Sequence, residues 1–249
     1  MKTRKNILII AGFDPSGGAG VLADVKTIEQ NKLQSFAVIT ANTVQTEDSF
    51  QSVNWIDEEL VMTQLGEIID RYPIQGVKIG LVPNGEFLEK AIRFVLEIQG
   101  LAHFEKPIIV WDPVLSTSTG FNFEQGFENL ESVLKLIDYI TPNQDEIRFL
   151  TGKDALHGAK ELSKYTNVYL KGGHSEDLGT DYLVKEDQVF PFKPKVIGSE
   201  KHGSGCIQSS ALLSSLILGN PEVKACLKAK RYVEQKLSSN NTLLTYHKP

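Results

Sequence analysis

The stretch Ile7-Leu8-Ile9-Ile10-Ala11 decides the fold class of this 249-residue chain. It is a short, unbroken apolar run, which indicates a strand buried on both faces, as in a parallel sheet covered by helices. The segment 12–20 follows at once, and its glycines, proline and aspartate are typical of a tight loop between a strand and a helix. Leu22, Val25 and Ile28 then recur at helical spacing. The start of the chain therefore predicts a strand–loop–helix unit.

Apolar runs and helical spacings alternate along most of the remaining chain. We predict strands at 36–40, 77–82, 108–111, 139–141 and 167–170, and helices at 21–30, 60–72, 87–98, 127–136, from 142, from about 207 and at 221–237. Two short apolar runs, 182–184 and 188–190, predict a small late β-hairpin. This alternation indicates an α/β fold with a mostly parallel central sheet and helices on both faces. We expect a single domain over 1–249 that ends in a polar, frayed tail at 238–249.

Composition excludes several classes of partner. The net charge is −5 and there is no basic tract, so neither nucleic acid nor an anionic membrane surface has electrostatic support as a partner. No apolar run approaches the ~20 residues of a membrane span. Two cysteines, Cys206 and Cys226, in a chain of this length without a signal-peptide pattern indicate a cytoplasmic protein with free thiols.

The segment Gly203-Ser204-Gly205-Cys206 precedes a long apolar helix. Glycines at a helix start expose backbone N–H groups at the positive end of the helix dipole, and this arrangement binds anions, phosphate above all. Cys206 falls in the first turn, where the dipole is expected to lower the pKa of its thiol. The alternative is a glycine-rich turn with a buried cysteine that packs as a small apolar residue.

Polar side chains lie at the ends of several predicted strands or at the starts of the helices that follow. Asp112 is at the sheet edge where ligands of open α/β sheets collect. Lys171 is placed to reach a phosphate as a point charge. Gln45 suits a nitrogen heterocycle, or is simply solvated. Asp24 faces whatever fills the preceding loop, or only complements the helix dipole.

Asn143 and Glu146 share one face of the helix that begins near residue 142. An amide oxygen and a carboxylate are ligands suited to Mg²⁺ or to its water shell. The same spacing is also that of a capping box, with Asn143 as the N-cap and Glu146 at the third helical position. The sequence leaves both interpretations open.

Several stretches together match one known family. They are Ala11–Gly20 with Ala23–Thr27, Val38–Ala41, Val77–Gly80, Asp112–Val114, Thr141–Asn143 with Glu146, Lys171–His174 and His202–Cys206. On these motifs the chain resembles the hydroxymethylpyrimidine/phosphomethylpyrimidine kinases of thiamine biosynthesis, in the ribokinase-like superfamily. The resemblance implies a ribokinase-like fold, a homodimer, and transfer of the γ-phosphoryl group of ATP to the hydroxymethyl group of 4-amino-5-hydroxymethyl-2-methylpyrimidine and/or its monophosphate.

The resemblance also implies roles for individual residues. The backbone N–H groups of Gly203, Ser204, Gly205 and Cys206 would bind the transferred phosphoryl group, with Cys206 as the general base and Lys171 neutralising phosphate charge. Asp112, Asn143 and Glu146 would hold Mg²⁺. The implied ring-binding residues are Gly12, Asp14, Gly20, Asp24, Gln45 and Leu81, and the implied ATP-binding residues are Asn143, Lys171, His202, Gly203 and Gly205. His202 would orient a phosphate or merely cap its loop.

The chain also departs from the family pattern. Thr46 replaces an Asn, and Leu81 stands where a Met is common. Segment 116–121 lacks a Lys and an Asp, and Glu200-Lys201 replaces Asn-Thr. The last two changes remove charged or polar contacts to phosphate. The open alternatives are therefore a pyridoxal/pyridoxine kinase of the same superfamily and a non-catalytic paralogue that binds the ring.

Overall fold

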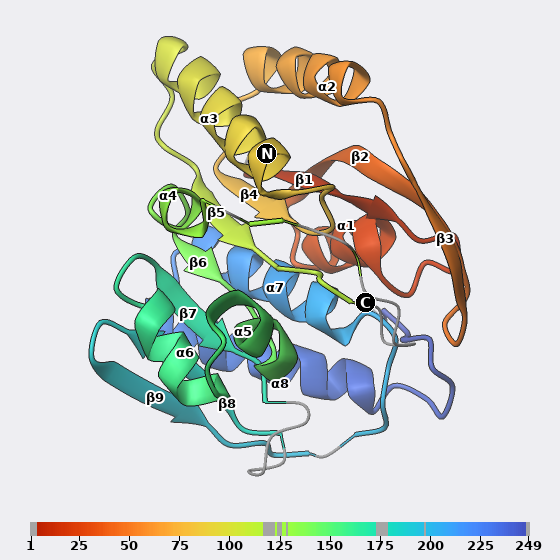
Figure 1. The fold of residues 1–249 in the computed structure, drawn as a ribbon. Helices are drawn as coiled ribbons and strands as arrows, with labels where there is room; N and C mark the ends of the chain where they lie inside the picture. Colours follow the sequence, from red (N-terminus) through yellow and green to blue (C-terminus); the bar gives the residue numbers. More distant parts are fainter. Residues whose placement is uncertain are drawn as a thin grey trace.

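One mixed sheet organises the part of the chain that the structure describes. The structure is a computed structural model, and it describes residues 4–116, 123, 126–127, 129–172, 179–196 and 198–247. Nine strands within these residues form the order β3-β2-β1-β4-β5-β6-β7-β8-β9 (Figure 1). The strands are β1 (Asn6–Phe13), β2 (Gln34–Gln45), β3 (Phe50–Trp55), β4 (Gly76–Ile79), β5 (Ile108–Trp111), β6 (Tyr139–Ile140), β7 (Asn167–Leu170), β8 (Asp181–Lys185) and β9 (Gln188–Phe192). The helices are α1 (Gly20–Gln30), α2 (Glu58–Arg71), α3 (Gly85–Leu101), α4 (Leu130–Leu134), α5 (Gln144–Thr151), α6 (Ala155–Leu162), α7 (Ser204–Ile217) and α8 (Glu222–Leu237).

The centre of the sheet is parallel and its edges are antiparallel. Neighbouring strands from β2 through β1, β4, β5 and β6 to β7 all run parallel. β3 pairs antiparallel with β2, and β8 and β9 form the late hairpin beside β7. The predicted mostly parallel sheet with a late hairpin is confirmed. Because the parallel strands share one direction, their carboxyl ends meet at one edge, where ligand sites form in such sheets.

Helices cover both faces of the sheet. Side chains of α2, α3, α4, α5 and α6 join one apolar cluster, and those of α1, α7 and α8 join the other. The strand β1 feeds both clusters: Leu8 and Ile10 belong to the first, and Ile7 and Ile9 to the second. Alternate side chains of a strand point to opposite faces, so an unbroken apolar run is what a strand covered on both sides requires.

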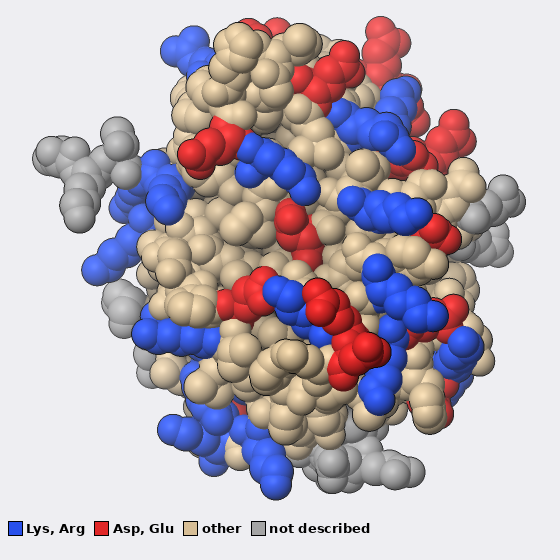
Figure 2. Space-filling view, turned by 90° about the vertical axis from the view of Figure 1, so that its left-hand side faces the viewer, with Lys and Arg blue, Asp and Glu red and all other residues tan. Residues whose placement is uncertain are grey.

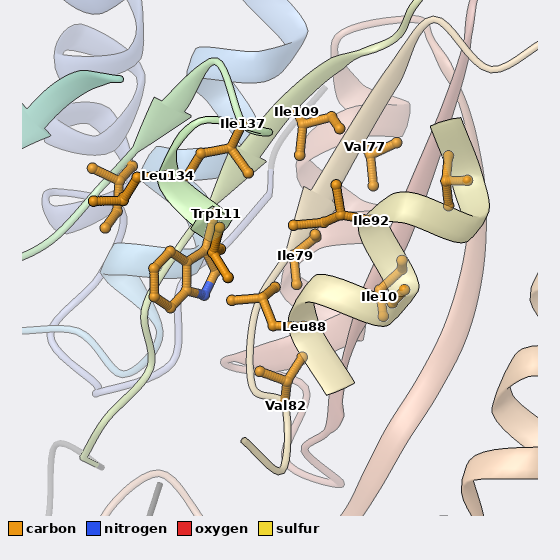
Figure 3. Close-up of a cluster of buried hydrophobic side chains, with 14 of the residues drawn as sticks. Ile10, Val77, Ile79, Val82, Leu88, Ile92, Ile109, Trp111, Leu134 and Ile137 are labelled. Carbon is orange, nitrogen blue, oxygen red and sulfur yellow. The ribbon is translucent and has the colours of Figure 1, made fainter. Parts of the chain in front are cut away.

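The helix α3 shows how an amphipathic stripe seats a helix on the sheet. Leu88 and Ile92, four residues apart on α3, lie on one helix face and point toward the strands in Figure 3. They meet Ile79 of β4 and its neighbours, and all of these side chains are essentially inaccessible to solvent. Asn84 caps the helix start by accepting a hydrogen bond from the Phe87 N–H at 2.8 Å.

The β2–β3 hairpin differs from the prediction. The sequence predicts a strand at 36–40 followed by a loop, whereas β2 continues to Gln45 and pairs with β3. The burial of β3 alternates only weakly, and its residues are half-buried or exposed. A partly solvated hairpin carries no long apolar run, so the spacing of apolar residues did not reveal it.

Three further segments differ from expectation. The helix expected at 127–136 is limited to the single short helix α4, and α6 was not anticipated. The tail was expected to fray, but it packs against the two glycine-rich loops, at 14–20 and 200–205. The Lys201 ammonium donates a hydrogen bond to Asn240 O at 2.7 Å, and the His202 N–H donates to Leu243 O at 3.0 Å. Hydrogen bonds of this kind order a polar segment that hydrophobicity alone would leave free.

Charged side chains of both signs are distributed over the surface (Figure 2). On the face shown in Figure 2, basic and acidic side chains are interspersed, and neither sign gathers into a large patch. None of the described helices is long and apolar enough to cross a membrane.

Candidate active site

The carboxyl edge of the parallel strands brings most of the predicted site residues together. Asp14 follows β1, Asp112 follows β5, Asn143 follows β6 and Lys171 follows β7. They surround a cavity of about 570 Å³ whose described lining is Ala11, Gly12, Asp14, Ala19, Gly20, Thr43, Gln45, Phe50, Lys78, Leu81, Asp112, Val114, Ser116, Phe123, Asn143, Asp145, Glu146, Lys171, Glu200, Lys201, His202, Gly203, Ser204, Gly205 and Cys206. Residues that are far apart in sequence thus form one site. Gly173, His174 and residues 117–121 lie outside the described residues.

A second cavity of about 370 Å³ lies beside the first. It extends toward β8, β9 and α8, and its lining includes Asp181, Gln208 and Lys230. The two cavities share Asn143, Lys171, Glu200, Lys201, Ser204 and Gly205. The start of α7 therefore forms the junction between two adjoining hollows.

Gly203 makes this junction sterically possible. It is the N-cap of α7 and has φ = 73°, in the left-handed region that favours glycine. A Cβ atom on Gly203 would lie 2.1 Å from the carbonyl oxygen of Gly18. The two glycine-rich loops therefore pack backbone against backbone, and α7 directs the N–H groups of its first turn toward the cavity edge.

Cys206 does not have the predicted acidity. Its side chain lies in the first turn of α7 and is only 9% exposed. Burial raises the pKa of the Cys206 thiol to about 12, although the nearby Lys78 ammonium acts in the opposite direction. The prediction of a lowered pKa is therefore wrong, because the cost of burying a thiolate exceeds the benefit of the helix dipole and of one cation.

One buried lysine, one partly buried lysine and three buried carboxylates form a charged cluster at the cavity. The Lys171 ammonium lies 2.8 Å from Asp112 Oδ1 and 3.6 Å from Glu146 Oε2. The Lys78 ammonium lies 2.9 Å from Asp24 Oδ2 and 3.8 Å from Asp112 Oδ2. Asp112 thus lies between both cations. Sequence analysis overlooked Lys78, because a lysine inside an apolar strand gives no signal until its partners are known.

The carboxylates of this cluster differ in acidity. Burial acts to raise the pKa of Asp112, but Lys171 and Lys78 outweigh it and hold that pKa below its usual value. Burial raises the pKa of Glu146 to about 7, because Lys171 only partly compensates and Asp112 adds repulsion. Burial also raises the pKa of Asp24 despite Lys78. The positive charge of Lys171 therefore only partly offsets the cost of ionising Glu146.

Asp24 is not where the sequence placed it. It was expected to face a ligand in the preceding loop, but its side chain is fully buried and is not among the described residues that line the cavity. It accepts hydrogen bonds from Lys78 Nζ and, at 2.7 Å, from Ser210 Oγ. Asp24 therefore holds Lys78 in place and does not itself line the cavity.

Asn143 and Glu146 form the capping box that was one of two interpretations. The Glu146 N–H donates to Asn143 Oδ1 at 2.8 Å, and the Asn143 N–H donates to Glu146 Oε2 at 2.6 Å. Both residues also line the cavity beside Lys171. The box fixes the Glu146 carboxylate at the cavity wall, so the cap and a ligand-facing position coexist.

Asp14 and His202 connect the two glycine-rich loops. Asp14 accepts hydrogen bonds from the N–H groups of Ser16 and Ala19, and its Oδ2 lies 2.9 Å from His202 Nε2. These hydrogen bonds hold the pKa of Asp14 below its usual value, although burial opposes them. His202 therefore secures its loop, which is one of the two roles considered for it.

The far end of the cavity is more apolar. Leu81, Val114 and Phe123 line it, and Phe50 meets Phe123 edge-to-face with ring centroids 5.6 Å apart. Gln45 lies at the same end, with its amide N–H donating to Thr43 Oγ1 at 2.8 Å. Phe50, Val114 and Phe123 were missed, because an aromatic or aliphatic residue in an unassigned loop cannot be distinguished by sequence from a core residue.

Comparisons with known proteins agree on one family. Residues 14–249 match the family described as phosphomethylpyrimidine kinase. A hydroxymethylpyrimidine/phosphomethylpyrimidine kinase of Aquifex aeolicus is 34% identical over 249 residues, with 95% of each chain covered. A crystal structure of phosphomethylpyrimidine kinase from Clostridium difficile superposes with a TM-score of 0.73 at 28% identity, covering 92% of this chain and 98% of that one.

A more distant likeness concerns the fold alone. The pyridoxal kinase of Staphylococcus aureus, solved with AMP-PCP and pyridoxal, superposes with a TM-score of 0.81 at 22% identity, covering 97% of this chain and 91% of that one. The family match spans nearly the whole chain and includes the site residues described above from Asp14 onward. The chain is therefore a kinase that belongs to the phosphomethylpyrimidine kinase family.

Proposed function

We propose that this chain transfers the γ-phosphoryl group of ATP to the hydroxymethyl group of 4-amino-5-hydroxymethyl-2-methylpyrimidine, its monophosphate, or both, in thiamine biosynthesis. The observation that carries this proposal is the pair of adjoining cavities that share the start of α7 and Lys171. A kinase must hold a nucleotide and an acceptor on either side of the transferred phosphoryl group. The larger cavity has an apolar end for a ring, and the smaller one receives the nucleotide.

Positioning and charge account for most of the catalysis in such a transfer. In our proposal the N–H groups of the first turn of α7 bind the equatorial oxygens of the phosphoryl group, where the helix dipole favours negative charge. Lys171 lies beside this turn: a Cβ atom on Gly205 would be 3.1 Å from its ammonium. Gly205 thus leaves room for the ammonium next to the phosphoryl position.

Magnesium fits the donors present. Asp112, Asn143 and Glu146 offer two carboxylates and an amide oxygen beside the shared junction, and Mg²⁺ prefers such oxygen ligands. The raised pKa of Glu146 supports this assignment, because a bound cation would offset the cost of burying the charged carboxylate. Among the described residues no three His, Cys, Asp or Glu form a metal site by themselves, so phosphate oxygens and water must complete the shell. Bound with ATP, Mg²⁺ would neutralise charge on the phosphate oxygens.

Cys206 lies where the proposed ring cavity meets the proposed phosphoryl-binding turn. It lines the larger cavity and lies in the first turn of α7, the helix that would bind the phosphoryl group. We assign it to accept the proton of the attacking hydroxyl group as phosphoryl transfer proceeds. Because burial raises the pKa of the Cys206 thiol to about 12, its proton must first pass to bulk water. The resulting thiolate, stabilised by the Lys78 ammonium, would then take the proton of the attacking hydroxyl group.

Simultaneous binding tests the two-cavity assignment. We expect AMP-PCP and hydroxymethylpyrimidine to bind together with a stoichiometry of one each, measured by titration calorimetry of one ligand with the other at saturation. Because the ring and the adenosine would occupy different cavities, neither should exclude the other. Strict competition between them would contradict the assignment.

The Glu146→Gln variant should be more stable than the wild type above neutral pH and should depend less on Mg²⁺. The folded state binds the Glu146 proton more tightly than the unfolded chain, so this residue stabilises the fold while protonated and loses that contribution as pH rises through about 7. Gln mimics the protonated form and keeps the capping box. In Mg²⁺-free buffer above neutral pH, the free energy of unfolding should increase by roughly 1–3 kcal/mol, and below the unfolded-chain pKa of 4.5 it should not change.

The same variant should weaken the Mg²⁺ dependence of turnover, measured by titration of Mg²⁺ at fixed ATP. Glu86→Gln is the matched control, because Glu86 also lies in the first turn of an Asn-capped helix but is exposed. An unchanged Mg²⁺ titration in Glu146→Gln would leave Glu146 with its capping role alone.

We further propose that the protein is a cytoplasmic homodimer. Both cysteines are free and buried, as expected in a reducing compartment. Val44, Trp55 and Leu60 are large apolar side chains left exposed on β2, β3 and near the start of α2. Light scattering should give twice the chain mass, and a monomer would contradict this proposal.

A further inference from the structure

The C-terminal segment after α8 folds back against the two glycine-rich loops of the active site. In this segment, Asn240–Leu244, Asn240 Oδ1 accepts from the Thr242 N–H at 2.8 Å, and Asn240 Nδ2 donates to Leu244 O at 2.9 Å. The segment is therefore a turn with its own hydrogen bonds. It lies against both glycine-rich loops, at 14–20 and 200–205.

Lys201 holds this segment at three points. Its ammonium donates to Asn240 O at 2.7 Å, to Asn240 Oδ1 at 2.9 Å and to Thr242 O. The residue is only 3% exposed although it lines both cavities. A lysine beside a phosphate site is usually expected to bind phosphate. Here all three donors of the ammonium are engaged by the C-terminal segment.

Two more contacts connect the segment to the loops. The N–H of His202 donates to Leu243 O at 3.0 Å, one residue before the N-cap of α7. Leu244 packs on the other loop so tightly that a Cβ atom on Gly18 would lie 2.8 Å from its Cδ2. The segment therefore contacts both loops whose backbones meet at Gly203.

We propose that Lys201 is a positioning residue which, by fastening Asn240–Leu244, holds the Gly203–Cys206 turn in the geometry that phosphoryl transfer requires. This inference rests on the proposed function. Transition-state hydrogen bonds from backbone N–H groups depend on placement to a fraction of an ångström, so a loosened loop loses rate more than substrate affinity. The contribution of Lys201 is made through the loop and not by contact with the reacting atoms.

Alkylation of the two cysteines tests the positioning without relying on activity. In Lys201→Met, iodoacetamide should modify Cys206 about tenfold faster than in the wild type, because local opening exposes the first turn of α7. Cys226, on the buried face of α8, is fully buried and should keep its slow rate. Peptide mass spectrometry measures both rates in the same sample. Cys226 thereby reports global unfolding, and Cys206 reports the loop.

Kinetics provide the second measurement. We expect Lys201→Met to lower kcat by about 10–100-fold with KM for the ring alcohol changed less than about threefold. Lys201→Arg should recover part of the rate, because a guanidinium can donate to the same carbonyl groups. Asn240→Ala keeps the lysine and should give a smaller loss in the same direction, which provides a test if Lys201→Met folds poorly.

Lys228→Met is the matched control. Lys228 also donates to an asparagine side chain, Asn220 Oδ1 at 2.8 Å, but neither residue lines the active-site cavity. It should leave both alkylation rates and kcat unchanged.

The possible outcomes are distinct. Faster alkylation of Cys206 alone, in Lys201→Met or Asn240→Ala, supports the inference. Unchanged rates at both cysteines, or equal acceleration at both, would overturn it, the second because it shows only general destabilisation. A wild-type protein without turnover would refute the proposed function, whereas the alkylation result would still decide the role of Lys201 in the loop.

Discussion

Cys206→Ala should lower kcat by roughly 10²–10⁴-fold while KM for the ring alcohol changes by less than about threefold. The thiol lines the larger cavity and lies in the first turn of α7. Under the proposed function, its main interaction develops only as the hydroxyl group loses its proton. Removing it should therefore affect the transition state and leave ring binding nearly intact. Steady-state kinetics with direct calorimetry of ring binding separates the two effects.

The pH profile of the wild-type enzyme provides a second, independent test of Cys206 as the base. Burial raises the pKa of Cys206 to about 12, and a base must be deprotonated to act. Since kcat/KM reports the free enzyme, it should rise by up to about tenfold per pH unit from pH 7 to pH 9, with no plateau in that range. In Cys206→Ala the residual rate should lose this slope.

Cys226→Ala is the matched control, because Cys226 is a buried free cysteine away from the cavity. It should leave kcat and the pH slope unchanged, even if it lowers stability. Near-wild-type turnover in Cys206→Ala would show that the proton leaves by another route, and Cys206 would then return to its role as a small apolar residue.

Gly203→Ala should unfold or inactivate the protein, with a loss of at least about 3 kcal/mol in the free energy of unfolding. The left-handed backbone at this position disfavours any side chain, and the added Cβ would meet Gly18 O at 2.1 Å and Ala19 Cα at 2.6 Å. Both neighbours are backbone atoms, so neither can turn aside as a flexible side chain would. The two glycine-rich loops would have to separate.

Substitutions at two other glycines distinguish the effect of backbone conformation from the effect of steric contact. Gly219 has φ = 83° but no neighbour within 4 Å, so Gly219→Ala should cost only about 1–2 kcal/mol from backbone conformation. Gly205→Ala meets only the tip of Lys171, and it should leave the fold intact while lowering kcat. Chemical denaturation and kinetics measure all three. Equal losses in Gly203→Ala and Gly219→Ala would show that the two loops do not pack as described.

The fold was largely predictable, because the informative segments are buried on both sides. The apolar run Ile7–Ile10 of β1 predicts a parallel sheet, and its side chains alternate between the two apolar clusters. The β3 strand could not be predicted in this way, because its partly solvated residues carry neither a continuous nor a cleanly alternating apolar pattern. Periodicity reports burial, and elements at the margin of the core are therefore the ones it misses.

The site was predictable in position but not in its charges. The strand ends correctly indicated that Asp112, Asn143 and Lys171 would converge at one edge. The pairing of Asp24 with Lys78 was not visible, because it joins α1 to the interior of β4 across 54 residues. The direction of the Cys206 pKa shift was predicted wrongly. The sequence indicates that Cys206 lies at a helix start, but it does not show how deeply the thiol is buried.

The most direct test of the central claim is ATP consumption by the purified protein with Mg²⁺, offered hydroxymethylpyrimidine, its monophosphate and pyridoxal in parallel. We expect turnover with hydroxymethylpyrimidine, its monophosphate, or both, and little with pyridoxal. Turnover with pyridoxal alone would contradict the proposed substrate and assign the chain to vitamin B6 chemistry. Absence of turnover with all three, alongside measurable ring binding, would contradict catalysis and indicate a ring-binding paralogue.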